Sequence, residues 1–485
     1  MTLNYQSVLL KGQAYIGGKW RSGNAYYPVL NPANGEEIIK VPDLEAKDVN
    51  IAVNAAEQAL KSWGKVPAKE RAALMKRWHQ LILNNLDELA GIITAEQGKP
   101  LAAAKDEILY GASFIEWFAE EGKRAYGDII PAAKSSQRIL VSKEPVGVVG
   151  AITPWNFPNA MVARKVAPAL AAGCTVVLKP AEDTPLSALA MAVLAEQAGL
   201  PAGVFNIITT ACPADIGVAL TQHSVVRKLS FTGSTATGKI LLRQCSETVK
   251  KVSMELGGNA PFIVFDDACI DRAVEGAIAA KFRNTGQACI CANRIFVQEG
   301  CYDEFLEKFT KAVSILKVGS GFDEGIDLGP LINQSAIDKI DALVNDAKSK
   351  HGIILKGGKS HALGGLFYSP TVIGNASIDM RCFQEEIFGP IAPIFRFKDE
   401  KEVIAMANDT KYGLAAYFYA NDLARAFRVA EALEYGMVAI NEGSLSMETA
   451  PFGGYKESGI GREGSKYGLD DYLEIKYILL GGIEV

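Results

Sequence analysis

The chain has 485 residues, of which 49% are hydrophobic and 22% are charged, and its formal net charge is −5 at pH 7. This length exceeds the size at which one hydrophobic core stops growing, so we expect two or more domains. The negative net charge does not indicate binding to nucleic acid, and no apolar run is long enough to cross a bilayer. The first residues lack a signal-peptide cleavage site. We therefore expect a cytoplasmic protein.

The N-terminal part of the chain predicts a hairpin followed by helices. The dipeptide Asn34-Gly35 lies between short apolar segments, which is a hairpin signal. Helical periodicity dominates from about residue 47 to residue 122, with a break at residues 98–100. Residues 133–144 then resemble a strand that is added outside the main body.

From residue 145 onward, apolar strands alternate with helices. The expected strands are 146–152, 175–178, 205–208 and 228–231, and the expected helices include 162–172 and 186–198. This alternation predicts βαβ units on a parallel sheet that is covered on both faces. Ligands bind beyond the carboxyl ends of such strands. Three candidate loops lie there: 153–158, 179–184 and 232–238.

The same alternation resumes after Asn259 and predicts a second α/β domain. The expected strands are 261–265 and 294–298, and the expected helices are 270–283 and 302–316. Residues 470–485 resemble a further strand outside both domains. The fold class is therefore α/β, with two doubly wound parallel-sheet domains.

A cysteine in a short polar loop is the most informative feature of the chain. Cys289 follows the small and polar residues 284–288, and Glu255 enters a glycine turn some 30 residues earlier. A thiol nucleophile and a carboxylate base suffice for chemistry through a thioester. The alternative is that Cys289 is a small buried hydrophobe. Cys291 is the one cysteine close to it, and without a second pair we expect no metal site.

Three further segments suggest a nucleotide. Residues 231–238 put a glycine turn between a strand and a helix, where free amides favour a phosphate, although an ordinary turn is the alternative. Lys179 ends a buried strand, and Glu182 could accept bonds from ribose hydroxyls. An acidic group there favours NAD, because a 2′-phosphate would meet like charge. Glu386 and Phe388 precede a rigid turn, which could instead be a solvated loop.

Seven motifs, in order along the chain, resemble those of the aldehyde dehydrogenase superfamily. They are residues 154–158, 179–182, 231–238, 255–258, 286–289, 386–390 and 451–454. The resemblance covers essentially the whole chain. Residues 114–124 and 461–468 resemble those of bacterial succinate-semialdehyde dehydrogenases.

The resemblance implies three structural parts. They are an NAD-binding domain of residues 1–127 and 145–257, a catalytic domain of residues 258–456, and a bridging β element of residues 128–144 and 470–485. The bridging element would pair subunits into dimers or tetramers. The implied cofactor is NAD, with NADP as a second possibility, and the implied partner is a small aldehyde rather than nucleic acid or a membrane.

The resemblance also implies the catalytic roles. Cys289 is the nucleophile, Glu255 is the base that activates water, and Asn156 donates to the oxyanion together with the backbone N–H of Cys289. The thiohemiacetal on Cys289 gives hydride to the nicotinamide and becomes a thioester, which water hydrolyses. The implied cofactor-binding residues are Thr153, Pro154, Trp155, Lys179, Glu182, Gly233, Ser234, Leu256, Glu386 and Phe388.

The implied substrate is succinate semialdehyde, whose carboxylate would bind Arg164, Arg283 and Ser446. Each arginine could instead form a structural ion pair. Cys291 is a possible redox partner of Cys289, or else a packed bystander. Another ω-carboxylated aldehyde such as glutarate semialdehyde is an alternative, since one methylene changes discrimination by only about 1–3 kcal/mol. A coenzyme-A-acylating enzyme and a non-catalytic scaffold are disfavoured, because base and nucleophile are intact.

Overall fold

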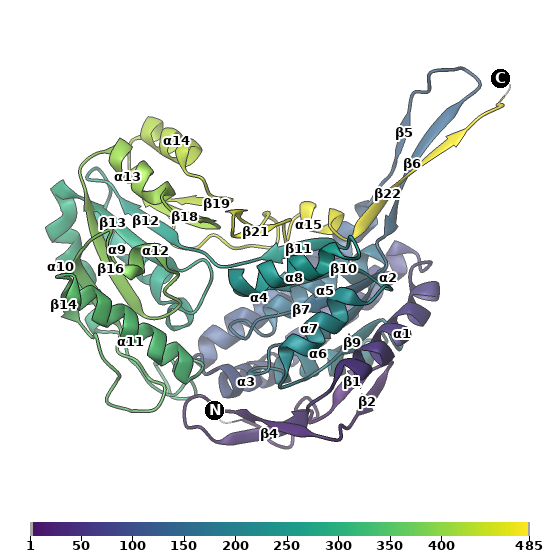
Figure 1. Cartoon of the computed structure of the whole chain (residues 1–485), viewed down its shortest axis with the longest axis horizontal. Coiled ribbons are helices and arrows are strands. Elements are labelled where there is room, and N and C mark those ends of the chain that lie inside the picture. The colour runs from purple at the N-terminus through teal and green to yellow at the C-terminus, as the bar shows by residue number, and fades with distance from the viewer. Residues whose placement is uncertain (1–2, 484–485) are drawn as a thin grey trace.

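Short apolar runs form the central strands of two largely parallel sheets, because helices cover both faces of each sheet. The computed structural model describes residues 3–483. The two sheets lie in separate lobes, and a three-stranded arm projects from one of them (Figure 1). The predicted α/β fold class is confirmed.

The first sheet has eight strands in the order β2-β1-β9-β8-β7-β10-β11-β21. Strands β7 to β11 are parallel, whereas β1, β2 and β21 form antiparallel edges. The strands are β1 Ala14–Ile16, β2 Lys19–Arg21, β7 Val148–Ile152, β8 Thr175–Lys179, β9 Phe205–Ile207, β10 Val226–Thr232, β11 Lys251–Glu255 and β21 Gly459–Ile460.

Helices cover this sheet on both faces, and neighbouring residues of one strand point to opposite faces. Val149 and Ala151 of β7 pack in one apolar core with α2 to α6, whereas Val148 and Ile152 pack in another with α1, α7 and α8. The helices are α1 Ala46–Trp63, α2 Ala68–Asn84, α3 Leu86–Gln97, α4 Leu101–Glu121, α5 Ala160–Ala172, α6 Leu186–Gln197, α7 Pro213–Gln222 and α8 Thr235–Ser246.

The second sheet has seven strands in the order β14-β15-β16-β13-β12-β18-β19. All neighbours are parallel except β14 and β15. The strands are β12 Ala260–Val264, β13 Ala292–Gln298, β14 Ile353–Lys356, β15 Thr371–Ala376, β16 Ile391–Phe397, β18 Ala415–Tyr419 and β19 Met437–Ile440. The helices are α9 Ile270–Phe282, α10 Tyr302–Ser314, α11 Gln334–Ser349, α12 Arg381–Gln384, α13 Glu400–Asn408 and α14 Leu423–Ala432.

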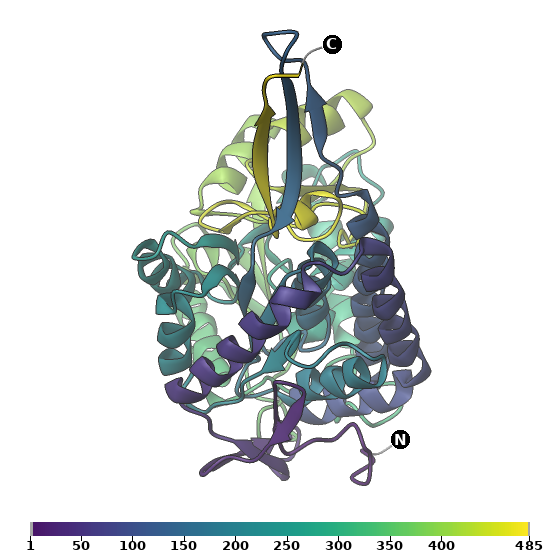
Figure 2. The same ribbon diagram turned by 90° about the vertical axis from the view of Figure 1, so that its right-hand side faces the viewer.

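The arm consists of β5 Asp128–Ile130, β6 Arg138–Pro145 and β22 Leu473–Leu480, which pair antiparallel (Figure 2). The last two residues of the predicted segment 470–485 lie outside the described residues. Smaller elements complete the fold: β3 Tyr26–Leu30, β4 Glu37–Pro42, β17 Tyr412–Gly413, β20 Tyr455–Lys456, η1 Gly122–Arg124, η2 Arg283–Gly286, η3 Glu299–Cys301 and α15 Tyr467–Asp470.

The predicted elements agree with these bounds to within a few residues. The predicted hairpin around Asn34-Gly35 is confirmed as β3 and β4. The helical region 47–122 is divided at Gly98, where φ is 89°, and also around residues 64–67 and at Asn85. None of the helices within residues 3–483 is long and apolar enough to cross a membrane.

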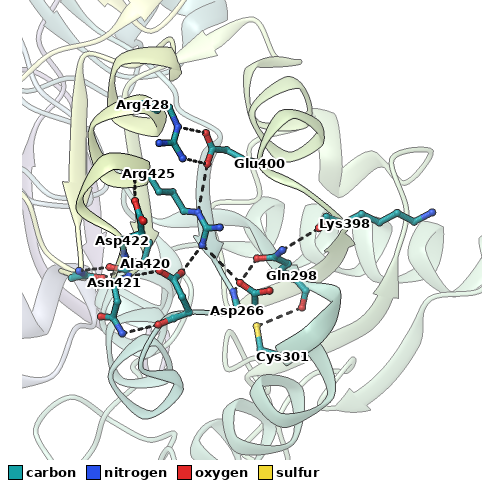
Figure 3. Close-up of polar contacts among 12 residues, drawn as sticks. Asp266, Gln298, Cys301, Lys398, Glu400, Ala420, Asn421, Asp422, Arg425 and Arg428 are labelled. Atoms are coloured by element: carbon teal, nitrogen blue, oxygen red, sulfur yellow. Dashed lines mark hydrogen bonds and ion pairs between the residues drawn. The ribbon is translucent and has the colours of Figure 1, made fainter.

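An ion-pair network around Arg425 of α14 lies at the carboxyl end of the second sheet (Figure 3). Its guanidinium lies 2.7 Å from Asp267, 3.8 Å from Asp266 and 3.5 Å from Glu400. The two aspartates follow β12, so these charges neutralise one another where parallel-sheet proteins often bind ligands. The predicted chemistry therefore lies at the opposite, amino end of this sheet.

Candidate active site

Two sheet edges meet at the predicted site. Strand register aligns Ile152 with Lys179 and Thr232 with Glu255 at the carboxyl edge of the first sheet. The chain then passes directly from β11 to β12, which begins the second sheet. Cys289 precedes β13, the neighbour of β12, and so lies at the amino edge of that sheet. The fold thereby brings the predicted base and nucleophile together although 33 residues separate them in sequence.

The glycine turn after Glu255 allows this close approach. The backbone N–H of Gly258 donates to Oε1 of Glu386 at 3.0 Å. A Cβ on Gly257 would lie 2.7 Å from Oε2 of Glu386, and one on Gly258 would overlap the carbonyl oxygen of Cys289. A side chain at Gly258 would therefore push apart the two segments that carry the site, and one at Gly257 would displace the carboxylate of Glu386.

The loop before Cys289 is buried, although its residues 284–288 are small or polar. Asn284 and Thr285 adopt left-handed conformations with φ of 50° and 59°, an uncommon state for a β-branched residue. The hydroxyl of Thr285 donates to the carbonyl of Gly329 at 3.1 Å. Oε1 of Gln287 accepts from the N–H of Ile332 at 3.1 Å. These bonds hold the loop in a strained form.

Asn156 is held beside this loop from both of its ends. Its side-chain Nδ2 donates to the carbonyl of Gln287 at 3.0 Å, and an amide has a second N–H free for another acceptor. Its own carbonyl accepts from Nζ of Lys99 at 2.8 Å and from Nδ2 of Asn284 at 3.0 Å. Lys99 is fully buried and pairs with Glu107. Sequence reasoning missed this pair, although a lysine inside a helix break and a carboxylate eight residues later were visible.

Glu255 is buried in a group of charges. Burial and the neighbouring carboxylate of Glu463 raise its pKa, and Arg164 and Lys165 oppose that shift. Glu463 lies 2.6 Å from both Arg164 and Lys165, which holds its own pKa below the ordinary value despite burial. Glu463 thus pairs with the two cations, and Glu255 is the carboxyl group of the two that binds a proton more readily. Glu463 and Lys165 were not predicted as site residues.

The thiol of Cys289 is protonated in the protein without substrates. Burial raises its pKa to about 12, against the opposing charge of Arg164. Cys291 is buried, burial raises its pKa, and its Sγ lies 3.7 Å from the carbonyl oxygen of Arg283. Both are free cysteines. The redox pairing of Cys289 with Cys291 stays a prediction.

The predicted cofactor residues line two cavities. One, of about 440 Å³, contains the ion pair of Lys179 and Glu182, whose Nζ and Oε2 are 3.0 Å apart. The other, of about 470 Å³, reaches Cys289. The residues shared by both cavities include Pro154, Trp155, Gly233 and Ser234; Thr153 lines the first, and Asn156, Leu256, Glu386 and Phe388 line the second.

This arrangement fits a dinucleotide. Ser234 caps helix α8, and its Oγ accepts from the N–H of Thr237 at 3.2 Å, so the helix end with its free amides lies where the two cavities share residues. Trp155 and Phe388 meet edge to face with ring centres 5.5 Å apart at the cavity near Cys289. Burial raises the pKa of Glu386 there to about 7. An adenosine end beside Glu182 and a nicotinamide end beside Cys289 match the two cavities.

The three predicted substrate residues come together on another side of Cys289. Arg164, Arg283 and Ser446 line a small cavity of about 30 Å³ with Cys289 and Tyr110. A larger cavity of about 460 Å³ continues from Arg283 and Ser446. Arg164 also forms the ion pair that was its alternative role, with Glu463. Tyr110 was not predicted, because a tyrosine on a long helix carries no distinctive sequence signal.

Comparison with known proteins identifies the family. Residues 20–478 match the model of the aldehyde dehydrogenase family. The chain belongs to this family. It is an NAD(P)-dependent oxidoreductase whose substrate is a small aldehyde, and the aldehyde dehydrogenase fold predicted from sequence is confirmed.

Its relatives are similar over nearly their whole length. A succinate-semialdehyde dehydrogenase [NADP(+)] of Escherichia coli strain K12 is 57% identical, over 99% of this chain and 100% of the relative. A 3-sulfolactaldehyde dehydrogenase of Pseudomonas putida is 55% identical, over 98% of each chain. A glutarate-semialdehyde dehydrogenase of Pseudomonas aeruginosa is 56% identical, over 98% of this chain and 99% of the relative. The crystal structure of an E. coli NADP-dependent enzyme, 56% identical, superposes with a TM-score of 0.98 over 99% of this chain and 100% of that one.

The reactivity of Cys289 is expected to rise steeply with pH in the protein without substrates. Only the thiolate is alkylated, and the raised pKa keeps the thiol protonated at neutral pH. The rate of inactivation by iodoacetamide should therefore increase about tenfold per unit between pH 7 and pH 9. Mass spectrometry of Cys289→Ala measures the labelling of the exposed Cys212 and Cys269, which is the background to subtract. A rate that is flat over this range would show that the thiolate already exists at pH 7.

Proposed function

We propose that this chain oxidises succinate semialdehyde to succinate with an NAD(P) cofactor. The observation that carries the proposal is the small cavity that Cys289 shares with Arg164, Arg283 and Ser446. An aldehyde carbon at the thiol would leave a carboxylate a few bonds away, within reach of cationic and hydroxyl donors. The names of the three relatives support an anionic end, because their aldehydes carry a carboxylate or a sulfonate.

In the proposed reaction, the side chains of this protein act in two stages. The Cys289 thiol first releases its proton to water, and the thiolate attacks the aldehyde carbon. Nδ2 of Asn156 and the backbone N–H of Cys289 stabilise the oxyanion, by roughly 3 kcal/mol per donor. A bound nicotinamide supplies the acceptor for the hydride. Glu255 then removes a proton from the water that hydrolyses the thioester. Its raised pKa makes it a stronger base than an ordinary carboxylate.

The variant Glu255→Gln should accumulate an acyl-enzyme. The amide keeps the shape of the side chain but cannot accept the proton of water, so hydrolysis of the thioester slows while its formation continues. Intact mass spectrometry after one turnover should find a succinyl adduct on most of the protein, and Cys289→Ala should carry none. Full turnover by Glu255→Gln without an adduct would move the base role to another residue.

The variant Arg283→Ala should erode selectivity for a charged substrate. Hydrogen bonds to charged groups contribute about 1.5–3 kcal/mol, so kcat/KM of the wild type should be at least about tenfold higher for succinate semialdehyde than for butanal. Arg283→Ala should raise KM for the semialdehyde and reduce that ratio.

Arg396→Ala provides a matched control, because this arginine pairs with exposed Asp303 on the surface. Equal use of succinate semialdehyde and butanal by the wild type would contradict the carboxylate site. A higher kcat/KM for glutarate semialdehyde would favour the alternative substrate, which is one methylene longer.

We propose that NAD is preferred over NADP, and the support is Glu182. Its carboxylate lines the cavity assigned to the adenosine end, and an NADP 2′-phosphate would meet like charge there. The E. coli relative is named for NADP. Glu182 therefore favours NAD for this protein, whereas the name of the relative favours NADP.

The variant Glu182→Ser should raise the kcat/KM for NADP relative to that for NAD. Removal of the carboxylate ends the repulsion and leaves Lys179 without its partner, free for a phosphate. Steady-state rates with both cofactors measure the ratio. A wild type with the higher kcat/KM for NADP would refute the preference.

The domain division and oligomeric state remain proposals of the same kind. We assign cofactor binding to residues 1–127 and 145–257, catalysis to residues 258–456, and subunit pairing to the arm. The support for the arm is β22, where Ile475 and Tyr477 are 72% and 60% exposed. An apolar strand at the edge of the arm, with no further strand beside it within residues 3–483, favours pairing with a second copy into dimers or tetramers.

A further inference from the structure

Tyr110 forms hydrogen bonds with two of the predicted substrate residues, Arg164 and Ser446. It lies on α4 and lines the small cavity with Cys289. Its hydroxyl accepts from Nη1 of Arg164 at 3.3 Å and forms a second hydrogen bond with Oγ of Ser446. Its ring is fixed edge to face against Phe114, with ring centres 5.0 Å apart. A rigid hydroxyl therefore stands between the guanidinium and the serine.

The donor and acceptor capacities of the side chains give a direction to the hydrogen bonds from Arg164 through Tyr110 to Ser446. An arginine has no acceptor, so Arg164 must be the donor to the Tyr110 oxygen. A hydroxyl whose oxygen accepts from a cation becomes a stronger donor. Either hydroxyl can donate in the bond between Tyr110 and Ser446, and polarisation by Arg164 favours the Tyr110 proton as the one directed at Oγ of Ser446. With that direction, Ser446 keeps its own proton for another acceptor in the cavity.

The two arginines are not equivalent. Arg164 is only 2% exposed, and Glu463 at 2.6 Å already neutralises its charge. Arg283 is partly exposed, and no ion pair formed within residues 3–483 includes it. Its guanidinium lies over the ring of Phe157, 5.1 Å from the ring centre. Arg283 is thus the cation free to meet an anion directly, whereas the hydrogen bond to Tyr110 gives Arg164 an indirect route.

We propose that Tyr110 is a specificity-determining residue that transmits the polarisation of Arg164 to Ser446. In this series of hydrogen bonds, Ser446 is held as a donor. A donor suits the oxygens of a carboxylate or sulfonate, which can only accept. The inference rests on the proposed function, because it concerns how the anionic end of that substrate is recognised. Without the phenol, Ser446 can rotate and present a lone pair to the anion, which repels it.

A double-mutant cycle tests the inference. The measured quantity is the ratio of kcat/KM for succinate semialdehyde to kcat/KM for butanal, in wild type, Tyr110→Phe, Ser446→Ala and the double variant. Each single variant should lower the ratio about five- to tenfold, through KM for the semialdehyde. The double variant should lower it no further than the larger single effect, because both remove one chain of bonds.

Tyr435→Phe is the matched control. Its hydroxyl also accepts from an arginine, Arg294 at 2.9 Å, and donates to the carbonyl of Ala407 at 2.6 Å, outside the cavities around Cys289. Its ratio should equal that of the wild type. An unchanged ratio in Tyr110→Phe, or single effects that multiply in the double variant, would overturn the inference while the proposed function stands. A wild-type ratio near one would overturn both.

Discussion

The meeting of two sheet edges is the constraint on which the site depends. The carboxyl edge of the first sheet carries Lys179 and Glu255, and the amino edge of the second carries the loop of Cys289. Parallel sheets gather loops from distant segments at one edge. Because β11 continues into β12 through a glycine turn, the two edges are held within bonding distance. Cofactor and substrate can then approach one thiol from different sides.

The polar interior of the site is stable because its charges are shared. Glu463 forms ion pairs with both Arg164 and Lys165, and Lys99 forms one with Glu107. A buried charge without a partner would cost several kcal/mol, so these pairs must form together with the fold. Beside this cluster, burial and the carboxylate of Glu463 raise the pKa of Glu255 against the opposing charges of Arg164 and Lys165. Structure and reactivity therefore depend on the same ion pairs.

The same logic distinguishes the two ends of the second sheet. At its carboxyl end, Arg425 is surrounded by carboxylates that neutralise its charge. At its amino end, hydrogen bonds of Thr285 and Gln287 hold a strained loop in place. Strain of this kind persists where surrounding contacts determine it, and it occurs often at active sites. The amino end of the sheet thus carries the nucleophile on a loop held by buried hydrogen bonds.

Local sequence patterns alone predicted most elements, since strand and helix periodicities and glycine breaks are short-range signals. The order of the motifs predicted the family, and with it the roles of Cys289, Glu255 and Asn156. The hydrogen-bonding partners within and around the site were decided only by tertiary structure. Lys99 reaches Asn156 across 57 residues, Lys165 reaches Glu463 across 298, and Tyr110 reaches Ser446 across 336. Contacts over such separations depend on how whole sheets and helices pack, and no local pattern of residues encodes them.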